Sequence, residues 1–164
     1  MPTDEPIRLV PADPGWSERF RLEEDAIGAW VVGGIHHVGS TAVPGLAAKP
    51  VVDILAGVRD LETARACFAP LAVLDYLYAP YLPEVMHWFC KPDPARRTHH
   101  LHLVPMVSRR YRDELSFRDR LRADPGLAAD YAALKYRLAE RHRDDREAYT
   151  DAKGAFIRAA LAAP

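Results

Sequence analysis

The chain has 164 residues, of which 49% are hydrophobic and 27% are charged, and its formal net charge is −1. This length and composition are those of an ordinary globular protein, so a single domain over residues 1–164 is expected. So small a net charge gives no electrostatic footprint for nucleic acid or for an anionic membrane surface.

The remaining bulk features favour a cytoplasmic protein. No apolar stretch approaches the roughly 20 residues that a membrane span needs, and the first residues show no signal-peptide pattern. Cys67 and Cys90 lie far apart and form no C-x-x-C pair. We therefore expect two small buried thiols in a reducing compartment and no disulfide framework.

Helix and strand signals are mixed along the chain. In order, the predicted elements are an extended lead-in over 1–12, a helix from 13 to the glycine pair at 33–34, strands over 35–38 and 51–58, a helix over 61–71, strands over 73–81, 85–91 and 98–104, and helices over 109–123, 127–142 and 146–162. The near-continuous apolar run at 51–58 is typical of a central strand covered on both faces. This order predicts an α/β (α+β) domain with a small mixed sheet and a helical C-terminal third.

The segment that joins the strands at 35–38 and 51–58 has the pattern of a phosphate-binding turn. Gly39 allows backbone angles that other residues avoid and lets another group approach the main chain closely. Ser40 and Thr41 carry hydroxyls and can cap a following helical turn, whose unpaired N–H groups attract phosphate.

Asp53 interrupts the apolar run of the second of these strands. A buried carboxylate of this kind has two interpretations: a structural group bonded to the backbone or to an arginine, or a metal ligand whose charge a cation compensates. The position of Asp53 just after the Gly39-Ser40 turn favours the metal ligand.

The strand over 98–104 contains an H-x-H pattern. Side chains alternate along a strand, so His100 and His102 share one face, while His99 lies on the opposite, core-facing side. Two imidazoles and an Asp from a neighbouring strand could form a facial metal site. Within such a site the pair could equally donate to phosphate or act as acid and base. The alternative is that both are surface polar positions or hydrogen-bonded core histidines, and the H-x-H pairing favours the site over it. The pair His36-His37 allows the same argument more weakly.

Several basic residues could serve an anionic ligand. Lys49 precedes the strand of Asp53 and could reach a phosphate at the Gly39 turn. Arg118, Lys135 and Lys153 lie on predicted helices, where spacing alone favours a solvated face with i, i+4 pairs. No P-loop, G-x-S-x-G, H-E-x-x-H or dinucleotide fingerprint is present, so serine-hydrolase chemistry has little support.

The motifs together resemble one family. The matching blocks are Val38–Ile54, Arg97–Val104, Phe117–Arg122, Tyr131–Lys135 and Ala148–Lys153, in this order along nearly the whole chain. These blocks resemble the signature of the GrpB (UPF0157-like) proteins, a group regarded as part of the nucleotidyltransferase superfamily. The resemblance implies a mixed sheet flanked by helices, with a Gly-Ser turn before a strand that carries metal-binding carboxylates.

The resemblance also assigns roles. It implies that Gly39 and Ser40 hold the triphosphate and that Asp53 is the first metal carboxylate. With the H-x-H pair added, the expected catalytic and metal-binding residues are Asp53, His100 and His102, and the expected cofactor is a divalent metal, Mg²⁺ or Mn²⁺, with Zn²⁺ as the alternative. With the hydroxyls and basic residues above, the expected phosphate- or nucleotide-binding residues are Gly39, Ser40, Thr41, Lys49, Arg118, Lys135 and Lys153. Some members of the family occur fused to dephospho-CoA kinase, which implies nucleotide-like ligands.

The chain departs from the superfamily pattern at two places. The second carboxylate is expected two positions after Asp53, where this chain has Leu55, and the later strand that often supplies a third acidic group carries His100 and His102. Two-metal transfer normally relies on paired carboxylates. The leading hypothesis is a nucleotidyltransferase-like enzyme that binds a nucleoside triphosphate and a divalent metal. The alternatives are a non-catalytic module for a nucleotide or phosphorylated metabolite, and a His/Asp metal-dependent phosphohydrolase.

Overall fold

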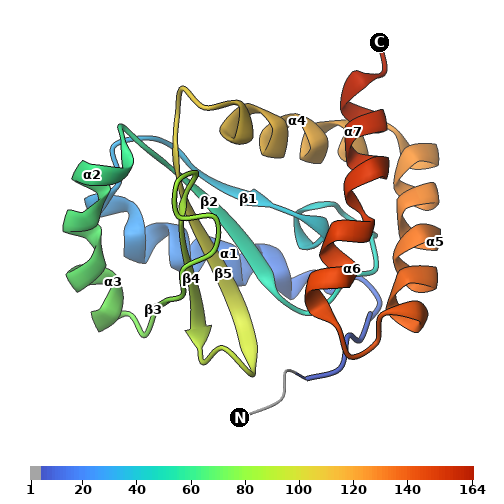
Figure 1. Cartoon of the computed structure of the whole chain (residues 1–164), viewed down its shortest axis with the longest axis horizontal. Helices are drawn as coiled ribbons and strands as arrows, with labels where there is room; N and C mark the ends of the chain where they lie inside the picture. Colours follow the sequence, from blue (N-terminus) through green and yellow to red (C-terminus); the bar gives the residue numbers. More distant parts are fainter. Residues whose placement is uncertain (1–4) are drawn as a thin grey trace.

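A computed structural model describes residues 5–164, so the first four residues of the expected lead-in lie outside the described part. The sheet has five strands: β1 (Ile35–Val38), β2 (Val52–Val58), β3 (Leu77–Tyr78), β4 (His87–Pro92) and β5 (Arg97–Pro105). Their order across the sheet is β1-β2-β5-β4-β3, with β2 and β5 parallel and the other pairs antiparallel (Figure 1).

Helices follow and separate these strands. They are α1 (Gly15–Ile27), α2 (Leu61–Ala64), α3 (Phe68–Val73), α4 (Arg109–Ala123), α5 (Pro125–Arg141), α6 (Arg146–Ala152) and α7 (Gly154–Ala162), with short 3₁₀ turns η1 (Gly28–Trp30), η2 (Ser40–Ala42) and η3 (Arg65–Cys67). The predicted α/β architecture with a helical C-terminal third is therefore confirmed. No helix within residues 5–164 is both long and apolar enough to cross a membrane.

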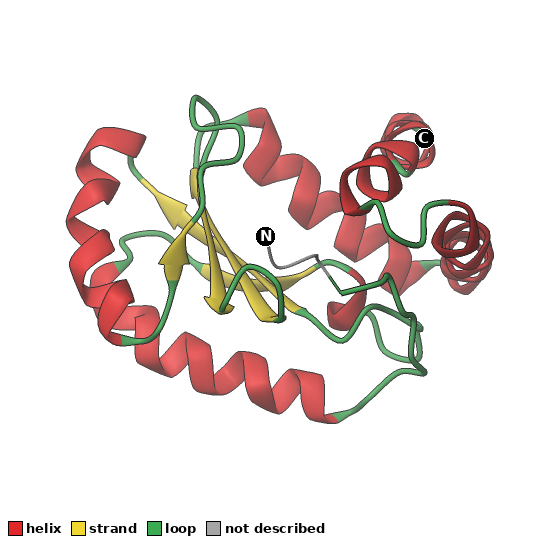
Figure 2. Cartoon of the chain, turned by 60° about the horizontal axis from the view of Figure 1, so that its bottom comes forward, coloured by secondary structure: helices red, strands yellow, loops and turns green. Residues whose placement is uncertain are grey.

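The sheet is covered on both faces (Figure 2). Trp16 of α1 and Leu71 of α3 pack with Ile54 and Leu101 in the larger apolar cluster on one face. On the other face, Leu55 belongs to a smaller cluster that includes side chains of α4. The predicted central strand at 51–58 is thus confirmed as buried on both sides. Helices α5, α6 and α7 stand beside α4 at one end of the sheet (Figure 1).

The predicted strand over 73–81 is wrong for most of its length. Helix α3 ends at Val73, and only Leu77 and Tyr78 pair with β4. Between them the chain turns at Asp75, whose φ of 64° is a left-handed conformation that a short polar side chain tolerates. The apolar letters of this stretch serve a helix end and a turn as well as a strand.

Other helix boundaries also differ from the sequence pattern. The first helix ends at Ile27 instead of reaching the glycine pair at 33–34, and the helix expected over 61–71 is divided into α2, η3 and α3. The segment at 124–126, expected to separate two helices, instead begins the second one. The Asp124 side chain accepts a hydrogen bond from the Leu127 N–H, and Pro125 takes the first helical position.

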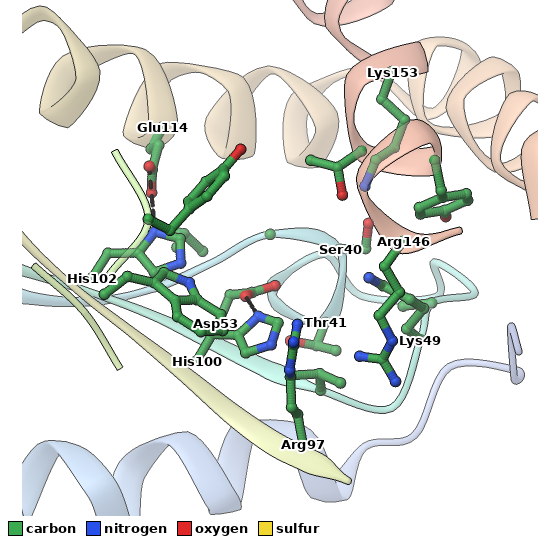
Figure 3. Close-up of a pocket in the computed structure, with 18 of the residues that line it drawn as sticks. Ser40, Thr41, Lys49, Asp53, Arg97, His100, His102, Glu114, Arg146 and Lys153 are labelled. Carbon is green, nitrogen blue, oxygen red and sulfur yellow. Dashed lines mark hydrogen bonds and ion pairs between the residues drawn. The ribbon is translucent and has the colours of Figure 1, made fainter. Parts of the chain in front are cut away.

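The last predicted helix, over 146–162, is divided into α6 and α7 at Lys153 and Gly154. Lys153 lines the cavity described below and extends toward Ser40 (Figure 3).

Candidate active site

A cavity of about 690 Å³ opens on the α4 face of the sheet. Its volume is within the range of sites that hold small-molecule ligands. The residues predicted from the sequence that line it are Gly39, Ser40, Thr41, Lys49, Asp53, His100, His102, Lys135 and Lys153. Arg118 is not among the lining residues; its guanidinium donates to the backbone oxygen of His37 and pairs with Asp119.

The parallel pairing of β2 and β5 brings the acidic and imidazole groups together. Asp53 lies opposite His100 in the register, and Leu55 lies opposite His102. The His100 Nδ1 atom is 2.9 Å from Asp53 Oδ1. One ligand atom from each of Asp53, His100 and His102 can be chosen so that all three lie within 4.8 Å of one another. The expected convergence of these three side chains is therefore present (Figure 3).

Gly39 is required by the position of the carboxylate. Its φ of 72° is in the left-handed region, and a Cβ atom at this position would lie 2.5 Å from Asp53 Oδ2. Such a distance is far below a normal contact, so any side chain would displace Asp53 or the turn. The turn can therefore pass close to the carboxylate only because residue 39 has no Cβ.

A carboxylate that the sequence analysis missed stands behind His102. Glu114 of α4 has a carboxylate oxygen 3.4 Å from His102 Nδ1, and it also pairs with Arg110 at 2.8 Å. The i, i+4 spacing of Arg110 and Glu114 is typical of a solvent-facing helix pair, so the sequence offered no signal that Glu114 is buried. A carboxylate on one ring nitrogen fixes the orientation of a histidine and its tautomer.

The pKa values of Asp53, His100 and His102, called the triad below, are shifted by different neighbours. Burial disfavours the charged form of Asp53, but the hydrogen bond and charge of His100 outweigh it and lower the pKa of Asp53 to about 2. Burial lowers the pKa of His100. Burial also opposes protonation of His102, but the charge of Glu114 outweighs it and raises the pKa of His102. Asp53 is thus a permanent anion at neutral pH.

The triad fits a divalent cation. It combines one carboxylate with two imidazoles, a donor set common for first-row metals. The Nε2 atom of His100 is buried and has no hydrogen-bond partner. A buried nitrogen without a hydrogen-bond partner costs folding free energy unless a ligand binds its lone pair or accepts a hydrogen bond from its N–H.

Three lysines form the opposite end of the cavity. Lys135 is only 2% exposed and donates to the hydroxyl of Ser40 and to the backbone oxygen of Ala47. Lys153 and Lys49 lie 4.5 Å and 5.2 Å from the centre of the Tyr149 ring. The helical spacing predicts a solvated position for Lys135, and this prediction is therefore wrong.

These lysines repel one another. Burial, followed by the charge of Lys49, lowers the pKa of Lys135 to about 7 and that of Lys153 to about 7. A cluster of amines that resist protonation in this way is stabilised when an anion joins them.

The back of the Gly39-Ser40 turn is held by neutral polar contacts. The Thr41 hydroxyl is 2.8 Å from His37 Nε2, and burial lowers the pKa of His37 to about 4. His36 contacts the hydroxyl of Tyr111. The weaker expectation of a ligand site at His36-His37 thus finds these two rings already bonded within the protein.

Comparison with known proteins points to one family. The model of the family described as "GrpB protein" matches residues 6–163. A UPF0157 protein of Pseudomonas aeruginosa is 41% identical over 162 residues, which cover 94% of this chain and 66% of that protein. The glutamate-rich protein GrpB of Alkalihalophilus pseudofirmus is 31% identical, covering 92% of this chain and 91% of the relative.

A solved structure has the same fold. The crystal structure of the conserved protein GrpB from Enterococcus faecalis matches with a TM-score of 0.82 and 31% identity, covering 93% of this chain and 94% of that one. A dephospho-CoA kinase of Mycolicibacterium paratuberculosis is 30% identical over 186 residues. This chain spans 44% of that kinase, about two thirds of the Pseudomonas protein, and 46% of the UPF0157 protein YqkA of Bacillus subtilis.

Proposed function

The chain belongs to the GrpB family, and from this premise we propose that it is a metal-dependent nucleotidyltransferase-like enzyme. It binds a nucleoside triphosphate and transfers the nucleotidyl group to a small-molecule acceptor. The observation that carries the proposal is the meeting, in one cavity, of the Asp53, His100 and His102 triad with the Ser40 turn and three lysines.

Asp53, His100 and His102 would hold the divalent cation. A cation held there neutralises charge on the phosphate oxygens and polarises the reacting phosphorus. Mn²⁺ accepts both oxygen and nitrogen ligands and is the first metal to test, whereas Mg²⁺ prefers an all-oxygen set and Zn²⁺ accepts imidazole readily. Glu114 holds His102 in the orientation that presents its other nitrogen to the cavity.

The lysine end would take the terminal phosphates. In the transfer step the oxygen or nitrogen of an acceptor hydroxyl or amine attacks the α-phosphorus and its proton passes to solvent, while the bond to the bridging oxygen breaks and pyrophosphate leaves. Negative charge increases on the leaving pyrophosphate, where Lys49, Lys135 and Lys153 supply positive charge. The Ser40 hydroxyl, already bonded to Lys135, lines the same end.

A second candidate function follows from Leu55. This residue occupies the position of the second carboxylate, and it is fully buried in an apolar cluster with Val38 and Met86. A site with one carboxylate on β2 suits a non-catalytic module that binds a nucleotide or phosphorylated metabolite. A third reading, hydrolysis of a phosphorylated substrate, replaces the acceptor with water at the same His/Asp site. The similarity to dephospho-CoA kinases supports a nucleotide-related ligand in each case.

The test combines binding and turnover. Calorimetry with the four nucleoside triphosphates is run with Mn²⁺, Mg²⁺ and Zn²⁺, beside an assay for pyrophosphate release with a panel of hydroxyl and amine acceptors. The proposal expects metal-dependent binding and turnover that Asp53→Asn abolishes, while the exposed control Asp130→Asn behaves like the wild type. Binding without pyrophosphate release favours the second candidate, phosphate release without any acceptor favours hydrolysis, and no nucleotide binding with any metal rejects the proposal.

A further inference from the structure

The cavity has an aromatic end that the proposed chemistry leaves unused. Trp88 of β4 is the register partner of His102, and its ring centre lies 4.9 Å from that of His100. Tyr81, in the loop before β4, lies 6.5 Å from Trp88 with an angle of 69° between the ring planes. Both rings line the cavity, so together they form an aromatic corner beside the triad.

The corner is only partly covered by the protein. Tyr81 is 42% exposed and Trp88 is half-buried, whereas Trp16, in the core, is 2% exposed. The guanidinium of Arg97 lies 5.1 Å from the centre of the Trp88 ring. This guanidinium lies over the Trp88 ring and also lines the cavity, and aromatic rings and guanidinium planes are the surfaces on which proteins stack bases.

Charge divides the cavity along its length. Figure 3 shows His102 and Glu114 at one end, Lys49 and Lys153 at the other, and Asp53 between them. Beside the aromatic corner Glu114 pairs with both Arg110 and His102, so the charges of these three groups compensate one another in part. A ligand that fits this arrangement has an anionic tail, a metal-binding centre and a flat apolar head.

A nucleoside polyphosphate has these three parts in this order. We propose that the nucleobase of the bound nucleotide stacks in the corner of Tyr81 and Trp88, so that its phosphate chain runs past the triad toward the lysines. The inference rests on the proposed function and adds to it the direction of the nucleotide and the residues that hold the base. The acceptor then approaches the α-phosphate from the open side of the cavity.

Stacking sets the expected specificity. Every base has a π-face, so a stacking corner without dedicated hydrogen-bond partners discriminates weakly among bases. The affinities of the four nucleotides should therefore lie within about tenfold of one another. The nucleobase as a whole should improve affinity about 5- to 150-fold over the bare phosphate chain.

The experiment compares two probes at saturating Mn²⁺: inorganic tripolyphosphate, and ATP with a methylene group between its α- and β-phosphates, which cannot be cleaved at that bond. Affinities are measured for the wild type, Trp88→Leu, Tyr81→Ala and Trp88→Phe. Trp30→Leu is the matched control, because Trp30 is 38% exposed and does not line the cavity. Binding of Mn²⁺ alone shows whether a change at residue 88 disturbs the neighbouring His100.

We expect the nucleotide to bind more tightly than tripolyphosphate, and Trp88→Leu and Tyr81→Ala to remove that advantage while tripolyphosphate and Mn²⁺ affinities stay within about twofold. Trp88→Phe and Trp30→Leu should retain it. Two results would contradict base stacking on Tyr81 and Trp88 while the proposed function stands: tripolyphosphate binds but the nucleotide binds no more tightly, or the nucleotide keeps its advantage in Trp88→Leu. If neither probe binds, both the proposed function and base stacking on Tyr81 and Trp88 are rejected.

Discussion

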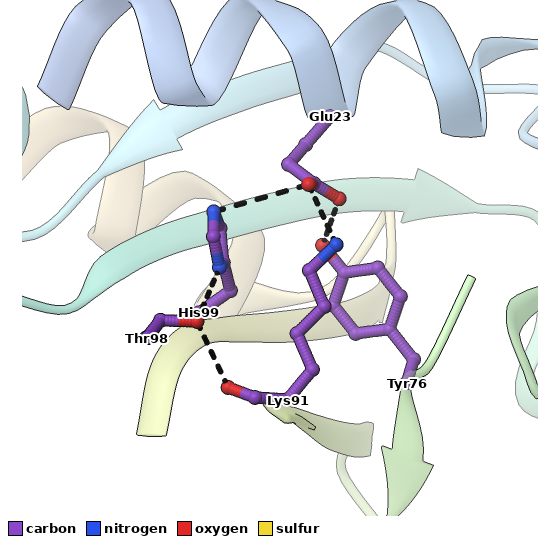
Figure 4. Close-up of polar contacts among 5 residues, drawn as sticks. All are labelled: Glu23, Tyr76, Lys91, Thr98 and His99. Atoms are coloured by element: carbon purple, nitrogen blue, oxygen red, sulfur yellow. Dashed lines mark hydrogen bonds and ion pairs between the residues drawn. The ribbon is translucent and has the colours of Figure 1, made fainter. Parts of the chain in front are cut away.

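The two faces of strand β5 hold histidines in opposite settings. His99 faces α1, where its Nε2 lies 3.9 Å from Glu23, and Glu23 is also bonded to the Lys91 ammonium at 2.6 Å and to the Tyr76 hydroxyl at 2.7 Å (Figure 4). His100 faces the cavity, where one ring nitrogen meets Asp53 and the other is buried without a partner. Each face thus joins a carboxylate to an imidazole.

The difference lies in how completely the polar groups are satisfied. Around Glu23, a cation and a hydroxyl compensate the carboxylate, and no cavity lining residue belongs to the group. Around Asp53, the protein leaves a nitrogen unsatisfied and an open volume beside it. A closed network of this kind stabilises a fold, whereas an incomplete one that borders a cavity can take a ligand. The predictions below separate these two roles.

The largest expected effect is on stability, from Lys91→Met. This change leaves Glu23 in the α1 face without its cation, and breaking a buried ion pair costs about 3–5 kcal/mol. Urea denaturation should show this loss of unfolding free energy, while Mn²⁺ affinity changes less than twofold. Arg21→Met is the control, because its pair with Glu18 is exposed and should contribute less than about 1 kcal/mol. Equal losses of unfolding free energy in the two variants would show that the contacts of Glu23 with Lys91 and Tyr76 do not stabilise the fold.

Asp53→Asn should have the opposite effect, a large loss of Mn²⁺ affinity with little loss of unfolding free energy. It removes the only carboxylate of the triad, and we expect Mn²⁺ affinity to fall by at least about 100-fold, the upper end of losses caused by altering the surroundings of a bound metal. Calorimetric titration with Mn²⁺ measures the loss, and urea denaturation should show less than about 1 kcal/mol of destabilisation. A variant that unfolds readily yet binds Mn²⁺ normally would make Asp53 a structural residue like Glu23.

The lysine end predicts a pH dependence of anion binding. Lys135 and Lys153 have pKa values of about 7 in the free protein, and a bound anion raises them, so protons are taken up on binding. Affinity for tripolyphosphate without metal should therefore be highest below pH 7 and fall as the pH rises. For each lysine that must be charged, the loss between pH 6.5 and 8.5 is about 20-fold.

A double variant, Lys135→Arg with Lys153→Arg, supplies the control for that measurement. Arginine stays protonated throughout this range, so the variant reports the titration of tripolyphosphate and of the other cavity groups, without that of the two lysines. The wild type should lose affinity with rising pH relative to the double variant, and parallel pH profiles would show that the lysines are already charged in the free protein.

Glu114→Gln should give the smallest effect. The change keeps the size of the side chain but weakens its hold on His102, and altering a carboxylate behind a metal-binding histidine typically costs about tenfold or somewhat more in metal affinity. The measurement is the Mn²⁺ titration used for Asp53→Asn. A matched change at the half-exposed Asp113 of the same helix, which does not line the cavity, should leave the affinity unchanged when made as Asp113→Asn. An unchanged affinity in Glu114→Gln as well would remove Glu114 from the site.

Much of this site is legible in local sequence. The alternation of His99, His100 and His102 along one strand places them on opposite faces whatever the rest of the fold, because successive side chains of a strand point to opposite sides. The apolar run around Asp53 predicts a buried carboxylate in the same way, and the glycine before Ser40 predicts a turn with unusual backbone angles.

Other features were decided only by the tertiary structure. Parallel pairing of β2 and β5 sets Asp53 opposite His100, and no local pattern determines a register between strands that are 38 residues apart at their nearest ends. Glu114 and Lys135 have helical spacings that fit a solvated face. Lys135 is buried and Glu114 is largely covered because α4 and α5 pack against the sheet and the Gly39-Ser40 turn. Periodicity determines which side chains share a face, whereas packing between distant segments determines what that face meets.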